Sequence, residues 1–189
     1  MSSSRRHFLR TTTALAGASL YVSRSSAQTA PGVQVAPSVA AAEAKAPPLP
    51  PVGSMLALPE VKLLEGSVFQ PAQANGRVTV IYWWASTCPF CALQSPEMEK
   101  LWLTERSKGQ KGLQFLTLSV DRKPEEALAY MKKKGYTFPA GFVTPEIQRA
   151  LPKPRGLPIT LVRGRDGKVL QAEKGQLFPE DVELLARWS

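Results

Sequence analysis

Hydrophobic and polar residues follow two patterns in the C-terminal part of the chain, and these patterns predict alternating strands and helices. Residues 78–84 read VTVIYWW, a β-branched and aromatic run that predicts a central strand covered on both faces. Residues 113–120 predict a second buried strand. Between them, apolar residues recur at helical spacing from about 88 to 107, and Pro96 is expected to kink this helix.

Three further helices are predicted after the second strand. The first begins at Pro124, because proline is favoured in the first helical turn, and acidic residues follow beside the positive end of the helix dipole. The last helix is expected to place Leu184, Leu185 and Trp188 on one face. The three helices cover residues 124–134, 146–151 and 180–188.

Two strands, residues 159–163 and 168–172, are predicted before the last helix. The Asp166-Gly167 pair between them is a strong hairpin signal, so these strands should be antiparallel. The earlier strands are separated by helices and should be parallel, while residues 57–70 show no clear pattern. The expected fold class is therefore α/β, with a mixed β-sheet and helices on both faces.

The first 27 residues have the pattern of an export signal. Arg5 and Arg6 precede an uncharged stretch over residues 11–23, and small residues lead to Ala27. The paired arginines resemble a twin-arginine signal, so we expect export to the periplasm and cleavage after Ala27. A retained membrane anchor is the alternative, but the uncharged run is far shorter than the ~20 apolar residues that span a bilayer.

Residues 28–56 are rich in alanine and proline and predict an extended linker, which leaves residues 57–189 as the globular domain. The formal net charge is +9, and removal of residues 1–27 would lower it to +5 because this segment holds four arginines and no acids. The remaining basic residues are scattered without interleaved aromatic residues, which argues against a nucleic-acid partner.

Composition excludes several kinds of site. Hydrophobic residues make up 43% of the chain and charged residues 21%, as in an ordinary globular protein. The single histidine, His7, would be lost with the signal, so the mature chain would have no histidine for a serine or cysteine hydrolase or for a metal site. Two cysteines are too few for a four-cysteine zinc site, and no metal is expected.

Cys88 and Cys91 form a C-x-x-C unit where the first strand meets its helix. Unpaired N–H groups and the helix dipole favour an anion at Cys88, and such a position can lower a thiol pKa from ~8.5 to ~3.5–7.5. Cys88 is therefore expected to be the nucleophile and Cys91, nearly one turn later, the resolving thiol. The alternatives are a permanent structural disulfide, which would close a very small loop, and a metal half-site without further ligands. Haem attachment would need a histidine where Ala92 stands.

Residues 84–91, WASTCPFC, resemble the W-A-x-W-C-x-x-C segment of thioredoxin-fold proteins. With the export signal, the chain resembles the TlpA/ResA/DsbE-type thiol–disulfide oxidoreductases over about residues 57–189. Further matching segments are Pro96, residues 119–121, residues 156–160 and residues 166–168.

This resemblance implies a thioredoxin fold and a dithiol chemistry that needs no cofactor. It also implies that Pro158 is cis and packs against the cysteine pair, although a proline at the start of a strand is the simpler interpretation. The backbone at Leu157 would pair with the extended chain of a bound partner, and Trp84 would join Leu157 and Pro158 as a partner-binding residue.

Three positions depart from the family pattern. Tyr82 stands where thioredoxins carry a buried acid, Gln94 stands where ResA-type relatives have a glutamate, and Thr87 replaces a tryptophan. Glu97 and Glu99 lie on the same predicted helix and are expected to be solvated surface charges.

The function expected from these observations is that of a periplasmic thiol–disulfide oxidoreductase that reduces disulfides in partner proteins. It would need a membrane electron donor, because the periplasm is kept oxidising. One alternative is an oxidant of the same fold that introduces disulfides. Another is a non-catalytic binding module or copper-handling protein, since a cysteine pair can bind Cu(I).

Overall fold

The structure of the protein is a computed structural model, and residues 44–189 are described. The expected signal peptide, residues 1–27, lies outside the described residues, and so does the expected linker up to residue 43. Within residues 44–189, no helix is both long enough and apolar enough to cross a membrane.

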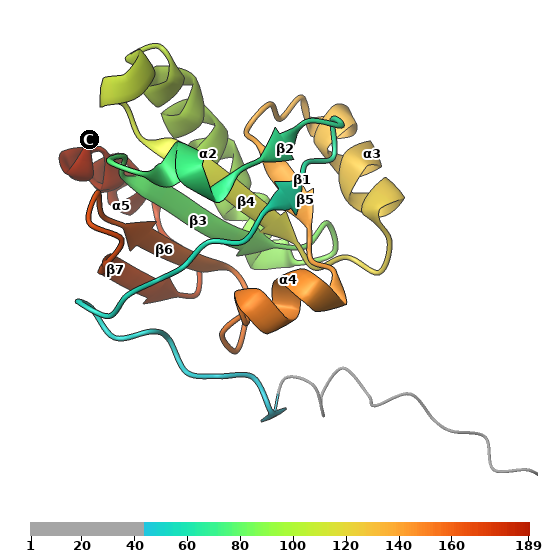
Figure 1. Ribbon diagram of the computed structural model, residues 1–189. Coiled ribbons are helices and arrows are strands. Elements are labelled where there is room, and N and C mark those ends of the chain that lie inside the picture. The colour runs from blue at the N-terminus through green and yellow to red at the C-terminus, as the bar shows by residue number, and fades with distance from the viewer. Residues whose placement is uncertain (1–43) are drawn as a thin grey trace, which may run out of the picture. The chain divides into compact units, whose positions relative to one another are not determined.

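A five-stranded mixed sheet forms the centre of the domain, in the order β5-β4-β3-β6-β7 (Figure 1). All six residues of β3 (Thr79–Trp84) are buried, as the uninterrupted apolar run predicts. β3 runs parallel to β4 (Gln114–Ser119) and antiparallel to β6 (Ile159–Arg163). β5 (Ala140–Phe142) extends the parallel side and β7 (Val169–Lys174) the antiparallel side. The expected mixed sheet is thus confirmed.

Within residues 44–189, four α-helices connect or follow the strands, and each begins with a proline. Proline suits this position because the first N–H groups of a helix have no partner within it. The helices are α2 (Pro89–Arg106), α3 (Pro124–Lys134), α4 (Pro145–Ala150) and α5 (Pro179–Leu184). Short 3-10 turns add η1 (Pro71–Ala74), η2 (Gly109–Lys111) and η3 (Leu185–Trp188).

The closing helix differs from the expectation. Leu184 is 54% exposed, whereas Leu185 is fully buried together with Val182. Neighbouring residues of a helix point about 100° apart, so Leu184 and Leu185 do not share a face. The buried face instead repeats every three residues, through Val182, Leu185 and the half-buried Trp188.

Two cores lie on opposite faces of the sheet, because alternate residues of a strand point to opposite sides. Tyr82 and Trp84 belong to the core that α2, α3 and α5 cover. Ile81 and Trp83 belong to the second core, which α4 and η1 cover. The helices therefore lie on both faces, as expected (Figure 1).

Two short strands before β3 were not predicted from the sequence. β1 (Val61–Lys62) and β2 (Val68–Phe69) form a two-stranded antiparallel ladder. Val61 packs against Gly141 of β5 so closely that a Cβ at Gly141 would lie 2.3 Å from a methyl carbon of Val61. These residues complete the second core on the β5 side.

The described end of the expected linker is attached to the domain. Gly53 donates its N–H to Val169 O at 2.8 Å, and the Val169 N–H donates to Ser54 O at 2.9 Å. Arg155 donates its backbone N–H to Pro47 O at 3.2 Å. The chain before β1 thus runs along β7 and the segment that precedes β6.

Candidate active site

Cys88 and Cys91 lie where the chain passes from β3 into α2. They form a disulfide with their Cα atoms 5.2 Å apart. Cys88 is the N-cap of α2, and its sulfur accepts a hydrogen bond from the Cys91 N–H at 3.1 Å. Cys91 is only 1% exposed, whereas Cys88 is half-buried. The more accessible cysteine is therefore the one at the helix N-terminus, as the sequence predicts.

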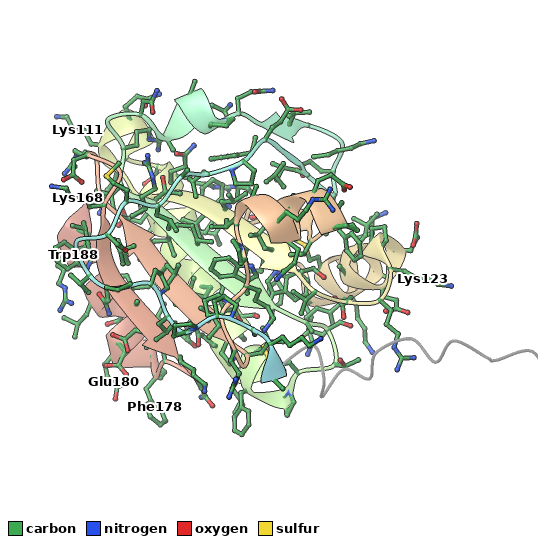
Figure 2. The ribbon with its side chains drawn as sticks, turned by 60° about the horizontal axis from the view of Figure 1, so that its bottom comes forward. Lys111, Lys123, Lys168, Phe178, Glu180 and Trp188 are labelled. Atoms are coloured by element: carbon green, nitrogen blue, oxygen red, sulfur yellow. A yellow bond between two sulfur atoms is a disulfide. The ribbon has the colours of Figure 1, made fainter. Side chains whose placement is uncertain are left out.

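The strand directions gather four segments at one edge of the sheet. Cys88 follows the C-terminal end of β3, and Asp121 follows the parallel strand β4. Pro158 precedes β6 and Phe178 follows β7, and both antiparallel pairings bring these positions to the same edge. Figure 2 shows Phe178 near this edge and Lys168, in the β6–β7 hairpin, at the opposite end. We call this end of the sheet the redox edge.

Tyr82 and Ser95 lie directly behind Cys91. The Tyr82 hydroxyl is 3.0 Å from Ser95 Oγ and donates to Cys91 O at 3.5 Å. Burial raises the pKa of Tyr82 well above its ordinary value, so the phenol stays neutral. The position that holds an acid in thioredoxins therefore supplies a hydrogen bond and no negative charge.

Gln94 is fully buried and joins three parts of the fold. Its Nε2 donates to Thr160 Oγ1 at 2.9 Å, and its Oε1 accepts from the Leu177 N–H at 2.8 Å. Gln94 thereby connects α2 to β6 and to the loop before α5. Both groups of the amide are satisfied, so its role in this structure is to hold the redox edge together.

The prediction that Glu99 is a solvated surface charge is wrong. Glu97 forms an ion pair on the helix surface. Glu99 is only 8% exposed, because its carboxylate accepts hydrogen bonds from both Thr137 N–H and Phe138 N–H, at 2.8 and 3.0 Å. The Thr137 hydroxyl donates to it as well. Glu97 instead pairs with Lys100 at 2.9 Å.

The Leu157–Pro158 peptide bond is cis, which confirms the expectation from the family resemblance. β6 begins at the next residue, where Ile159 pairs with Trp83. Leu157 is half-buried and packs against both cores. Its backbone N–H and C=O form no backbone hydrogen bond with any residue from 44 to 189. Direct packing of Pro158 against the cysteine sulfurs stays a prediction.

Trp84 is a core residue, which corrects its expected role as a partner-binding residue. Its side chain is 0% exposed, and its ring lies 5.8 Å from that of Tyr130. Its indole N–H donates to Thr117 Oγ1 at 3.2 Å. A partner cannot touch a side chain without accessible surface, so Trp84 can act on the site only by supporting β3.

Asp121 also belongs to the site, although its sequence pattern indicated only a family match over residues 119–121. It is 9% exposed, and its carboxylate accepts from Ser86 N–H at 2.9 Å and from Ser86 Oγ at 2.7 Å. Ser119 Oγ donates to its other oxygen at 2.7 Å. Polar residues at the end of a buried strand were the available signal, since strand ends of this sheet meet at one edge.

Exposed apolar side chains lie on segments next to the cysteine pair. Phe90 lies between the two cysteines and is 56% exposed, and Leu93, one turn along α2, is 61% exposed. Phe178 is 60% exposed and follows Leu177, whose N–H is bonded to Gln94 of α2. Such apolar groups next to a reactive site favour contact with another polypeptide. Among residues 44–189, no three histidine, cysteine or acidic side chains are grouped to hold a metal ion.

Comparisons with known proteins agree with this geometry. A family model described as Redoxin matches residues 51–183. A thiol:disulfide interchange protein of the thioredoxin family from Chlorobium tepidum aligns with a TM-score of 0.64 and 22% identity, covering 73% of this chain and 97% of that chain. A putative protein disulfide isomerase from Bacteroides thetaiotaomicron aligns with a TM-score of 0.63 and 22% identity, covering 72% and 86%.

A third similar structure is a secreted Mycobacterium tuberculosis disulfide oxidoreductase homologous to E. coli DsbE. It aligns with a TM-score of 0.59 and 15% identity, covering 69% of this chain and 96% of that chain. At these identities the likeness shows the thioredoxin fold. No curated protein sequence matches the chain significantly.

Proposed function

We propose a function from the premise that this chain belongs to the Redoxin family, whose model matches residues 51–183. It is a thiol–disulfide oxidoreductase of the thioredoxin fold, with Cys88 and Cys91 as its redox pair. In the cell, we propose, it reduces disulfides of partner proteins outside the cytoplasm. The observation that carries this proposal is the cysteine pair at the start of α2, with the more accessible cysteine at the N-cap.

The reaction takes place in two exchanges. The Cys88 thiolate attacks one sulfur of the partner disulfide, the partner S–S bond breaks, and the other partner sulfur leaves as a thiolate. Cys91 then gives up its proton and attacks the Cys88 sulfur, which releases the second partner thiolate and closes the Cys88–Cys91 disulfide. The partner gains two electrons and two protons, and a dithiol donor must return both to this protein.

The site geometry supports the assignment of the two roles. The Cys91 N–H already donates to the Cys88 sulfur, and the helix dipole adds a positive partial charge, so both stabilise a thiolate at Cys88. Cys91 is buried beneath Cys88 and within reach of it, which suits a thiol that acts only after the mixed disulfide has formed.

Partner binding is proposed to combine two kinds of contact. The Leu157 N–H and C=O can pair with an extended partner chain, since they lack backbone partners within residues 44–189. Phe90, Leu93 and Phe178 would cover apolar residues near the partner's cysteine. Disulfide-containing polypeptides are the substrate class that this combination fits, and a membrane dithiol is the proposed electron donor.

Location outside the cytoplasm is proposed from the signal-like residues 1–27. The similar protein from Mycobacterium tuberculosis is described as secreted. Cleavage after Ala27 would leave Gln28 as the first residue of the exported protein. The intact mass of the protein recovered from the periplasm should equal that of residues 28–189. A mass that includes residues 1–27 would contradict cleavage.

Single-cysteine variants test the proposed exchange. The Cys88→Ser variant is expected to lose all turnover of a disulfide-containing peptide, because no nucleophile remains at the helix N-terminus. The Cys91→Ser variant is expected to accumulate a mixed disulfide with the peptide through Cys88, which mass spectrometry would detect. A Cys88→Ser protein that folds and keeps wild-type turnover would refute the proposal.

A further inference from the structure

Asp121 brings a buried carboxylate from the end of β4 to the loop that precedes Cys88. The Cys88 N–H donates to Ala85 O at 3.1 Å, which closes a tight turn over residues 85–88. Ser86 lies inside this turn and is held by Asp121 through both its N–H and its hydroxyl. The position of the turn therefore depends on a side chain that lies 35 residues later in the sequence.

The carboxylate lies close enough to influence Cys88 through its charge. Two peptide units separate Ser86 from Cys88, which is at most ~7 Å of chain. Asp121 Oδ1 is 2.9 Å from Ser86 N, so the carboxylate lies within roughly 10 Å of the Cys88 backbone. Asp121 is 9% exposed, and a buried charge is screened by water and salt much less than an exposed one.

The chain around the cysteine pair carries no charge of its own. From Val78 to Pro96 the sequence contains no charged residue. In the segment before the cis-proline, Lys153 donates its ammonium to Pro154 O at 2.8 Å and to Gly156 O at 3.1 Å. Arg122 and Lys123 follow Asp121 and are exposed, and Figure 2 shows Lys123 pointing outward.

The Asp121 carboxylate also contributes to the pKa of a tyrosine on α3. The pKa of Tyr130 on α3 is raised from its ordinary value, chiefly by burial and in part by the Asp121 carboxylate. The charge of Asp121 is thus expected to act on groups other than its hydrogen-bond partners.

We propose that Asp121 is a positioning residue that holds the turn before Cys88 and whose negative charge disfavours the Cys88 thiolate. Because the thiolate belongs to the reduced state, this charge shifts the cysteine pair toward its disulfide and makes the reduced protein a stronger electron donor. The inference rests on the proposed function and deepens it, since it assigns a cause to the reducing direction.

The test compares the full-length protein with an Asp121→Asn variant in glutathione buffers at fixed pH. Two glutathione thiols supply two electrons and two protons to the Cys88–Cys91 disulfide and become glutathione disulfide. The equilibrium constant for this reduction should rise roughly threefold to tenfold in the variant, as expected for loss of one charge at this distance. The pH profile of Cys88 alkylation should move to lower pH.

A Ser119→Ala variant is the matched control, because it removes a hydroxyl donor to Asp121 but keeps the carboxylate. Its equilibrium constant should stay within about twofold of the wild type. If Asp121→Asn does not fold, Asp121→Ser provides a second uncharged variant with the same expected shift. The inference would be overturned if Ser119→Ala, which keeps the charge, changed the equilibrium constant as much as Asp121→Asn does. It would also be overturned if Asp121→Asn changed nothing. Either result would leave the proposed function intact. A wild-type pair that does not exchange with glutathione would overturn both.

Discussion

Cys88 and Cys91 differ in their surroundings although only two residues separate them. Cys88 is half-buried at the positive end of α2, whereas Cys91 is buried against a neutral hydroxyl pair, Tyr82 and Ser95. The helix N-terminus lowers the free energy of an anion at the first cysteine. Tyr82 cannot take the proton of the second cysteine as a base, because the buried phenol stays protonated. This asymmetry supports the proposal that Cys88 attacks and Cys91 resolves.

Tyr82 should make the folded protein sensitive to alkaline pH. Its pKa is raised by burial, so it keeps its proton when the tyrosines of the unfolded chain, with pKa values near 10, lose theirs. The unfolded state then binds fewer protons, and the free energy of unfolding falls as pH rises above about 10. At pH 11, Tyr82 alone should account for roughly 1–2 kcal/mol of this loss, measured by denaturant unfolding of the oxidised protein.

A Tyr82→Phe variant separates this effect from the others. At pH 8 it should be about 1–2 kcal/mol less stable, since Ser95 loses its buried hydrogen-bond partner. Between pH 8 and 11 it should lose less stability than the wild type. Ser95→Ala keeps the phenol and should retain the full alkaline loss. Parallel pH curves for Tyr82→Phe and the wild type would contradict this explanation.

α2 is held to the rest of the fold by buried acids along its length, as well as by apolar packing. Glu99 accepts from the backbone before β5, and Glu105 accepts from the Leu113 N–H before β4 at 3.0 Å. Gln94 adds contacts to β6 and to the loop before α5. The helix that carries the cysteines is thus attached at three positions along its length, which helps to keep its N-terminus in place.

Replacement of Glu99 by glutamine should show how much one of these contacts contributes to the free energy of unfolding. Glutamine can keep one oxygen on the two backbone donors but lacks the negative charge that strengthens both hydrogen bonds, so the Glu99→Gln variant should lose about 2 kcal/mol in denaturant unfolding. Glu97→Gln is the matched control on the same helix and should lose less than about 0.5 kcal/mol, because its ion pair with Lys100 is at the surface. Equal losses would contradict the structural role of Glu99.

Elements made of long, continuous patterns were predictable from the sequence. The buried strands β3 and β4 and the helices α2 and α3 agree with their expected ranges. β5 was missed because it spans three residues, including Gly141, and has no side-chain pattern of its own. β1 and β2 contain two residues each, which is too short for any period.

The site was predictable where its chemistry is local and not where it depends on distant contacts. The pairing of Cys88 with Cys91 follows from a short segment, whereas the cis bond at Pro158 was expected only from the family resemblance of residues 156–160. The contact of Asp121 with Ser86 joins residues 35 positions apart, and that of Glu99 with Thr137 joins residues 38 apart. Such contacts become visible only when the strand order is known.

On the scale of the whole molecule, the redox edge collects groups from nearly every strand of the sheet. The cysteine pair follows β3, the Asp121 carboxylate follows β4, the cis-proline segment precedes β6 and Phe178 follows β7. The chain before β1 is fastened nearby, through the Arg155 N–H and Pro47 O. A partner that binds at this edge would therefore meet the nucleophile, the free backbone of Leu157 and the apolar side chains together.

The central claim is that the Cys88–Cys91 pair works as a reductant of partner disulfides. A redox titration of the full-length protein against glutathione and dithiothreitol buffers tests it most directly. The account predicts a midpoint potential near the thioredoxin end of the family range, about −250 mV or lower. A potential between about −120 and −180 mV would instead indicate an oxidant or isomerase and would contradict the proposed direction.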